Sequence, residues 1–284
     1  MRDPNFVIPF DELPDRFAES VENPPAVPVE ARPAATIVLL RDGSEGLEAL
    51  LMRRSRRSGF VPGAYVFPGG RVDRSDAAPA VLERTIGLSA EAAAERLAMP
   101  DADPPAVAYY LAALREAFEE TGIMIGVGPQ GAPPPPAAED QAVERVREDL
   151  MERRIAFAGA LDRLGCRLAG DSVEYIAHWI TPEAEPRRYD TRFFAAKVRP
   201  GATPRVDPRE MTDALWIPPS DALGRTESGK LPMVFPTIRT LERLLEYPTA
   251  DDALADLARA PVPTIMPRLV VTPTGIGMRL DEDG

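Results

Sequence analysis

Three glutamates and one arginine near the middle of the chain have a spacing that places them side by side on a helix. Glu116, Glu119 and Glu120 stand at i, i+3 and i+4, and Arg115 precedes them. Like charges at these spacings destabilise a helix by roughly 0.2–0.5 kcal/mol per pair. A hard cation removes this repulsion, because Mg²⁺ takes oxygen ligands and keeps some waters for a phosphate-bearing substrate. The spacing therefore indicates carboxylate and metal chemistry on a phosphate compound.

A solvated helix face is the alternative interpretation, since any amphipathic helix carries charges opposite its apolar side. An apolar stripe at i, i+4, i+7 and i+11 is formed by Val107, Leu111, Leu114 and Phe118. The neighbouring residues favour the metal interpretation. Arg115 can pair with Glu119 at i+4 and fix its direction, and Gly122 supplies a helix stop directly after the glutamates.

A glycine turn and a cluster of arginines lie upstream of this helix. The paired glycines Gly69 and Gly70 allow the backbone to approach a ligand closely, although a bare dipeptide marks only a turn. Four arginines stand shortly before them, at Arg53, Arg54, Arg56 and Arg57. Guanidinium groups placed there could reach substrate phosphates. A solvated turn would account for the arginines equally well.

At these residues the chain resembles the Nudix hydrolase family. Residues 115–123 match the second half of the Nudix box, R-E-U-x-E-E-x-G-U, with Ala117 at the first apolar position. Gly70 resembles the glycine that opens the box in G-x5-E, and Asp76 stands where the glutamate is expected. Arg115 follows Gly70 by 45 positions instead of the family's fourteen, so an insertion at 77–103 splits the box. The resemblance implies a Nudix α/β/α sandwich with a mixed sheet, a helical insertion and a C-terminal helical addition.

From residue 50 to 73 the chain resembles the signature of coenzyme A-cleaving Nudix enzymes, and its split box resembles that of peroxisomal coenzyme A diphosphatases. The matching residues are Leu50, Leu51, Arg54, Ser55, Gly63, Phe67, Pro68, Gly69, Gly70 and Asp73. Met52, Ser58, Gly59 and Tyr65 depart from the signature. The resemblance implies metal-dependent hydrolysis of a diphosphate linkage, with coenzyme A or acyl-CoA giving 3′,5′-ADP and (acyl-)phosphopantetheine. Two alternatives stay open: hydrolysis of ADP-ribose, a dinucleotide or a nucleoside triphosphate, and a catalytically silent Nudix-fold binding module.

The resemblance also implies roles for individual residues. The ligands of Mg²⁺ or Mn²⁺ would be Glu116, Glu119, Glu120 and the carbonyl of Gly69. The substrate contacts would be Arg54, Arg57, Gly69 and Gly70. Arg115 would orient the glutamates. The general base would be Glu116 or Glu210, where Glu210 lies in a loop before the strand that contains Trp216. An exposed loop glutamate is the alternative for Glu210.

Composition limits the class of protein and its partners. The net charge of −12 argues against a nucleic-acid partner, because phosphate binding needs a cationic surface. No apolar run approaches the eighteen or so residues of a membrane span, and no secretory signal pattern is present, so we expect a cytoplasmic protein with a small-molecule diphosphate substrate. Homo-oligomer formation is left open. The single histidine, His178, rules out multi-histidine metal sites and is expected to be a hydrogen-bonded structural residue.

The chain is expected to divide into an extended N-terminal arm at 1–33, a Nudix domain at 34–245 and a C-terminal extension at 246–284. Apolar runs predict paired strands at 34–40 and 47–52 and a short strand at 123–125. Helices are predicted from residue 105 to 121 and at 141–154, 157–164 and 231–245. An alanine-rich helix capped by Ser89 is predicted within the insertion. Residues 261–284 read as a strand followed by an acidic tail.

Overall fold

The centre of the molecule is an eight-stranded mixed sheet in the order β11-β3-β2-β10-β9-β12, with β4 beside β3 and β5 beside β2. The computed structural model describes residues 6–13, 17–56, 61–129 and 131–280. The strands are β2 (Arg32–Gly43), β3 (Gly46–Arg54), β4 (Tyr65–Val66), β5 (Gly69–Arg71), β9 (Glu174–Ile180), β10 (Tyr189–Lys197), β11 (Met211–Ile217) and β12 (Thr264–Ile265). Strand β10 runs parallel to β2, and β12 runs parallel to β9. The other pairs are antiparallel, and β2 and β3 form the pair that was predicted.

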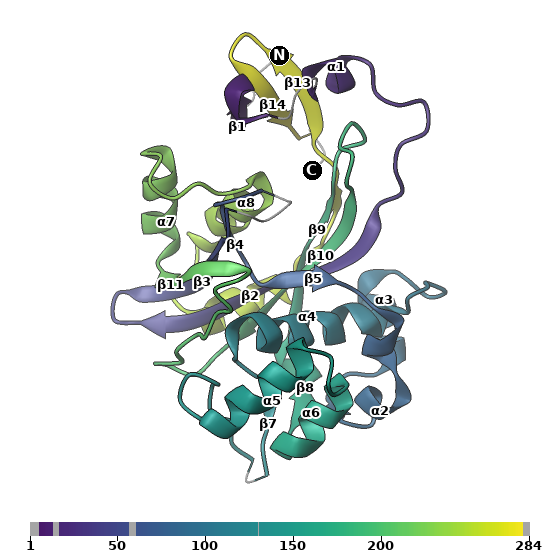
Figure 1. The fold of residues 1–284 in the computed structure, drawn as a ribbon, viewed down its shortest axis with the longest axis vertical. Helices are drawn as coiled ribbons and strands as arrows, with labels where there is room; N and C mark the ends of the chain where they lie inside the picture. The colour runs from purple at the N-terminus through teal and green to yellow at the C-terminus, as the bar shows by residue number, and fades with distance from the viewer. Residues whose placement is uncertain (1–5, 14–16, 57–60, 130, 281–284) are drawn as a thin grey trace.

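Helices cover both faces of the sheet, because its central strand is apolar on both sides. Successive side chains of a strand point to opposite faces. In β2, Ile37 and Leu39 join one core, while Val38 and Leu40 join the other. The first face carries α3 (Ala90–Leu97), α4 (Ala106–Thr121), α5 (Gln141–Met151) and α6 (Phe157–Leu164), and the second carries α7 (Pro219–Glu227), α8 (Phe235–Leu244) and α9 (Ala250–Leu257) (Figure 1). The predicted α/β/α sandwich is confirmed.

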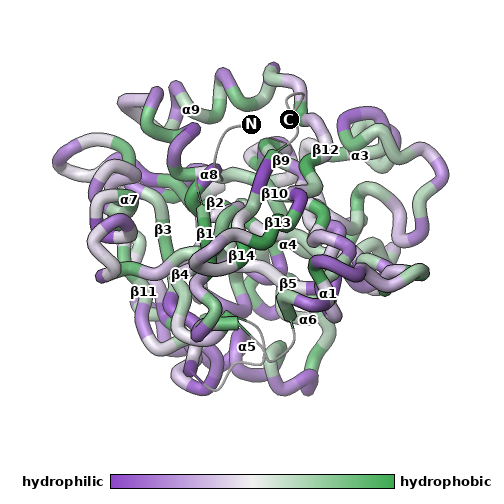
Figure 2. Tube along the Cα trace, turned by 90° about the horizontal axis from the view of Figure 1, so that it is seen from above, coloured by the Kyte–Doolittle hydropathy of each residue, from purple (hydrophilic) through white to green (hydrophobic). Residues whose placement is uncertain are grey.

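Helix α9 is amphipathic, and Figure 2 shows hydrophilic and hydrophobic residues alternating along its tube. Ala253 and Leu257 of α9 are buried in the second core, whereas Asp251 and Asp252 are exposed. The helix thereby buries one apolar side against the sheet.

The insertion is ordered and largely helical, as predicted, and is joined to the domain by a second small sheet. It contains α2 (Pro79–Leu82), β6 (Thr85–Ile86) and α3, which begins after the Ser89 cap. A short 3-10 helix, η2 (Arg74–Ala77), leads into it. Strand β6 runs parallel to β8 (Arg167–Ala169), which also pairs with β7 (Gly126–Val127). A 3-10 helix, η3 (Gly170–Ser172), follows β8.

The two ends of the described chain meet in a third sheet. Strand β1 (Phe6–Pro9) pairs with β14 (Gly275–Arg279), and β14 pairs with β13 (Arg268–Thr272). The segment at 1–33 thus holds β1, η1 (Phe10–Glu12) and α1 (Phe17–Glu22), and is tied to the C-terminal extension. The acidic tail at 281–284 lies outside the described residues.

The secondary structure differs from the prediction in four places. Residues 123–125 form no strand; they are a buried connection between α4 and β7, so burial in the core accounts for their apolar character. The helix predicted at 231–245 begins only at Phe235, followed by a proline in its first turn. Helix α7 was not predicted. The C-terminal strand at 261–284 is three short strands.

Candidate active site

Helix α4 carries the glutamates on the side that meets the glycine loop of β5. Its other residues are almost all buried, so packing on the sheet fixes the direction of the charged side chains. The helix ends at Gly122, whose φ of 69° lies in the left-handed region and whose N–H donates to the Phe118 carbonyl at 2.9 Å. A Cβ at Gly122 would lie 2.6 Å from that of Ala137, so glycine is required there.

The glycine loop contacts this helix directly, so the structure brings the two halves of the split box together. Strand β5 starts at Gly69, whose N–H donates to Glu120 Oε2 at 3.0 Å. A Cβ at Gly70 would lie 2.4 Å from Glu116 Oε1, and a Cβ at Gly69 would lie 2.6 Å from the Ala35 carbonyl oxygen. Only glycine allows the backbone to approach the carboxylates so closely.

Arg115 connects the loop, the start of the insertion and the glutamates. Its guanidinium donates to Glu116 Oε1 at 2.6 Å and to Glu119 Oε2 at 3.1 Å. It also donates to Asp76 Oδ1 at 2.7 Å and Oδ2 at 3.2 Å, and to the Arg71 carbonyl at 2.9 Å. Asp76, where the family glutamate was expected, is 2% exposed and accepts the Asp73 N–H at 2.8 Å. In this structure Asp76 is a buried partner of Arg115.

The carboxylates of α4 repel one another in a partly desolvated environment. Burial raises the pKa of Glu116 to about 7, opposed by the charge of Arg115 and reinforced by that of Glu119. Burial also raises the pKa of Glu119 and, together with the charge of Glu116, that of Glu120. Burial alone would lower the pKa of Arg115, but its hydrogen bond to Asp76 and the surrounding carboxylates raise it above its ordinary value. The cluster therefore favours added positive charge.

Glu210 lines the same cleft as this cluster, and Arg54 pairs with Met211, the residue that follows Glu210. The negative charge of Glu210 contributes to the raised pKa of Glu119 and of Glu120, which requires proximity. The positive charge of Arg54 lowers the pKa of Glu120. The two segments are joined by the Ser55 N–H, which donates to the Glu210 carbonyl at 2.8 Å. Arg57, the other predicted substrate contact, lies outside the described residues.

A cleft of about 1280 Å³ opens over these residues. Its charged end is lined by Asp73, Asp76, Arg115, Glu116, Glu119, Glu120 and Glu210. The rest of the wall comes from the insertion, from Asp207, Arg209 and Met211, and from the turn between α5 and α6. Glu152, Arg153 and Arg154 of that turn also line the cleft. Clefts of this size hold small molecules, and a group of convergent polar residues sets their orientation.

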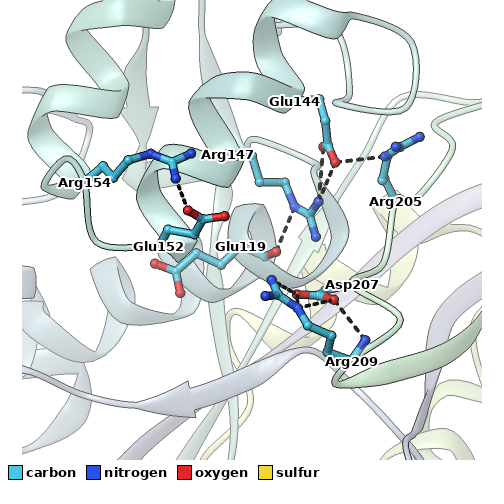
Figure 3. A network of polar contacts seen from close by, with 8 residues as sticks. All are labelled: Glu119, Glu144, Arg147, Glu152, Arg154, Arg205, Asp207 and Arg209. Carbon is cyan, nitrogen blue, oxygen red and sulfur yellow. Dashed lines mark hydrogen bonds and ion pairs between the residues drawn. The ribbon is translucent and has the colours of Figure 1, made fainter.

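A buried arginine that the sequence analysis missed supports the end of α4. Arg147 of α5 is 2% exposed and donates to the Glu119 carbonyl at 2.8 Å and to both Glu144 oxygens at 3.1 Å (Figure 3). Glu144 also accepts from Arg205 at 2.8 Å. A signal existed in the sequence, because Arg147 stands four residues after Val143, on the apolar side of its helix.

The residue types at the charged end fit a hard divalent cation. Three carboxylates project from one side of α4 toward a glycine loop that lies against them, and carboxylate and carbonyl oxygens are the ligands such cations take. In the described ranges, no group of three or more His, Cys, Asp or Glu side chains is arranged to hold a metal as it stands. Arg115 and the Gly69 N–H occupy one oxygen of each of the three glutamates.

His178 does not belong to this site. Its Nδ1 lies 2.8 Å from Thr264 Oγ1 and its Nε2 lies 2.6 Å from Asp190 Oδ1, between β9, β12 and β10. The predicted structural role of the histidine is confirmed. Within the described part of the chain, no helix is long and apolar enough to cross a bilayer.

Comparisons with known proteins agree with the fold and the box. Residues 29–244 match the family described as the NUDT19 Nudix domain. The acyl-coenzyme A diphosphatase NUDT19 of Gallus gallus is 32% identical over 241 residues, and that of Homo sapiens is 30% identical over 251 residues. These alignments cover 72% and 74% of this chain, which spans 63% of the length of each relative. A crystal structure of a NUDIX hydrolase from Alicyclobacillus acidocaldarius shares 32% identity with a TM-score of 0.65, covering 82% of this chain and 99% of that chain.

The sandwich, the reunited box and these matches show that the chain belongs to the Nudix hydrolase family, in the group described as the NUDT19 Nudix domain.

Proposed function

We propose that this chain hydrolyses a diphosphate linkage with the help of Mg²⁺ or Mn²⁺, and that its substrate is coenzyme A or an acyl-CoA. One observation carries the proposal: the loop at Gly69 and Gly70 lies in hydrogen-bond contact with the glutamates of α4, across a split of 45 positions. The products would be 3′,5′-ADP and (acyl-)phosphopantetheine. The names of the relatives support the substrate.

Different residues of the chain would bind the cation, orient its ligands and accept a proton. Glu116, Glu119, Glu120 and the Gly69 carbonyl would hold the cation, whose chemistry is to neutralise diphosphate oxygens and to acidify water. Arg115 fixes the directions of two of these carboxylates through its hydrogen bonds. A carboxylate of Glu210 or Glu116 would accept the proton of the attacking water. Water oxygen then bonds to one phosphorus, and the bridging oxygen leaves with the other phosphate.

Arg54 is proposed to select coenzyme A by its 3′-phosphate, a group that ADP-ribose and NADH lack. Arg54 of β3 pairs with Met211 of β11, and Met211 and Glu210 both line the cleft, so Arg54 lies beside the proposed diphosphate position. A charge-assisted hydrogen bond contributes roughly 1.5–3 kcal/mol, which is more than tenfold in discrimination.

Comparison of kcat/KM for coenzyme A and for 3′-dephospho-coenzyme A tests this assignment in the wild type and in Arg54→Ala. We expect the wild type to prefer coenzyme A by more than tenfold and Arg54→Ala to lose most of that preference. Arg53→Ala is the matched control, because Arg53 donates to the Gly63 carbonyl at 3.3 Å and lies over the Tyr65 ring at 5.8 Å. Equal efficiency on both substrates in the wild type would reject the 3′-phosphate contact.

Faster turnover of ADP-ribose, a dinucleotide or a nucleoside triphosphate would move the assignment to that substrate. No turnover of any of these compounds with Mg²⁺ or Mn²⁺ would favour a Nudix-fold binding module. The cytoplasmic location stays a prediction.

A further inference from the structure

One wall of the cleft contains apolar side chains that take no part in the chemistry proposed above, and they alternate with the charged side chains of Glu152, Arg153 and Arg154. We call the set of apolar side chains the apolar shelf and define it by Val81 of the insertion, Leu150 and Met151 at the end of α5, Ile155 in the following turn and Phe157 of α6. All five line the same cleft as the glutamates. A ligand whose phosphates lie at the charged end can therefore place another part against apolar carbon.

The base of the shelf belongs to the core of this face. Val81 is 3% exposed, and Leu150 and Phe157 are each 6% exposed. Ile155 packs against the same core while remaining half-buried, and Met151 is half-buried beside it in the lining of the cleft. The apolar wall is thus supported from behind and is not a loose surface patch.

Hydrogen bonds hold the turn that presents the shelf. Arg153 has a φ of 56°, in the left-handed region, and its N–H donates to the Leu150 carbonyl at 2.8 Å. The N–H groups of Arg154 and Ile155 both donate to the Asp149 carbonyl, at 2.8 and 3.3 Å. This backbone turn ends α5 and lies beside the cleft, with Ile155 and Phe157 among the lining residues.

A bidentate ion pair holds the two sides of the shelf together. Arg84, which follows α2 in the insertion, donates to Asp162 of α6 from Nε at 2.6 Å and from Nη2 at 2.9 Å. Strand β6 of the insertion also pairs with β8, which follows α6. The spacing between Val81 and Phe157 is therefore set by the fold before any ligand binds.

The candidate substrates differ in what lies beyond the diphosphate. ADP-ribose and dinucleotides carry a sugar there, and a nucleoside triphosphate carries only a terminal phosphate. Coenzyme A carries the pantetheine arm, which includes a dimethyl-substituted carbon and several methylenes as well as one hydroxyl and two amide groups. Burying a methylene strengthens binding about fourfold, whereas burying an unpaired sugar hydroxyl weakens it.

We infer that the apolar shelf binds the pantetheine arm of coenzyme A or acyl-CoA. The substrate then lies in one direction, with its nucleotide toward Arg54 and its pantetheine between the insertion and the turn after α5. The inference rests on the proposed function and adds the residues that recognise the second half of the substrate.

Binding of the two expected products, measured separately by calorimetry with Mg²⁺ present, tests the inference without turnover. We expect Ile155→Ser and Met151→Ser each to raise the Kd of 4′-phosphopantetheine at least about fivefold and to leave the Kd of 3′,5′-ADP within about twofold. Two variants are used because either side chain also packs near the core, and thermal unfolding checks that each is folded. Leu245→Ser is the matched control, since Leu245 is 52% exposed and follows α8 on the opposite face of the sheet.

Equal weakening of both products, or of neither, in both folded shelf variants would overturn the inference. A wild type that binds 3′,5′-ADP but not 4′-phosphopantetheine would overturn it as well. A wild type that binds 4′-phosphopantetheine on the shelf yet hydrolyses neither coenzyme A nor acyl-CoA would support the shelf and reject the proposed function.

Discussion

Arg115 joins four parts of the site through one guanidinium group. It contacts Asp76 before the insertion, the Arg71 carbonyl of β5, and two glutamates of its own helix. The Arg115 side chain is 13% exposed and that of Asp76 is 2% exposed. A pair this buried is held by its hydrogen bonds, and the loss of one partner leaves the other charge without compensation.

Removing this guanidinium is expected to destabilise the fold as well as the site. Arg115→Ala should lower the free energy of unfolding by about 3–5 kcal/mol, because Asp76 would remain buried without a counter-charge. The control is Arg209→Ala, since Arg209 is 73% exposed in its pair with Asp207 and its loss should change the free energy of unfolding very little. Urea unfolding measures the change in the free energy of unfolding for each variant. Equal changes in the two variants would show that Arg115 contributes to the site and not to the stability of the fold.

At the scale of elements, the insertion is part of the core as well as of the cleft. Ala93 and Leu97 of α3 are buried against the residues of α4, and Val81 of α2 joins the same cluster. Its strand β6 completes a sheet with β8. Replacing all of 77–103 by a linker would therefore uncover the core beside α4, so smaller changes separate its stabilising role from substrate binding.

A single truncation in α3 tests how firmly the insertion is packed. Leu97→Ala should reduce the free energy of unfolding by about 2–5 kcal/mol, as expected for a buried leucine. Glu95→Ala, an exposed position on the same helix, should change it by no more than about 0.5 kcal/mol. Thermal or urea unfolding compares the two. A loss below 1 kcal/mol for Leu97→Ala would mean that the insertion can detach without affecting the domain.

For the whole molecule, the features that could be predicted from the sequence are those that depend on residues close together in the chain. The apolar run at 34–40 predicted a central strand, and its alternation between two cores explains why helices cover both faces. The spacing of Glu116, Glu119 and Glu120 predicted their common side of a helix, since a helix repeats every 3.6 residues. The paired glycines were expected to let the backbone approach a ligand closely, and in the structure Gly70 lies directly against the Glu116 carboxylate.

The features that were missed depend on contacts between distant segments. Arg147 supports the end of α4 through a carbonyl 28 positions away, which no local pattern reveals. The apolar shelf is formed by the insertion and the turn after α5, and in the sequence α4 lies between these two segments. The run at 123–125 looks like a strand because a buried connection and a buried strand have the same composition.

The central claim is that the glutamates of α4 hold a divalent cation over the glycine loop and thereby cleave a diphosphate. It is tested most directly by coenzyme A hydrolysis in the wild type and in Glu120→Gln, with Mg²⁺ or Mn²⁺ and with excess EDTA. Glutamine can still accept the Gly69 N–H, and it removes one of the carboxylates that repel one another, so the variant should remain folded. The account predicts a metal-dependent wild type and a fall in kcat/KM of about a hundredfold or more in the variant. Full activity of Glu120→Gln, or wild-type activity in excess EDTA, would contradict it.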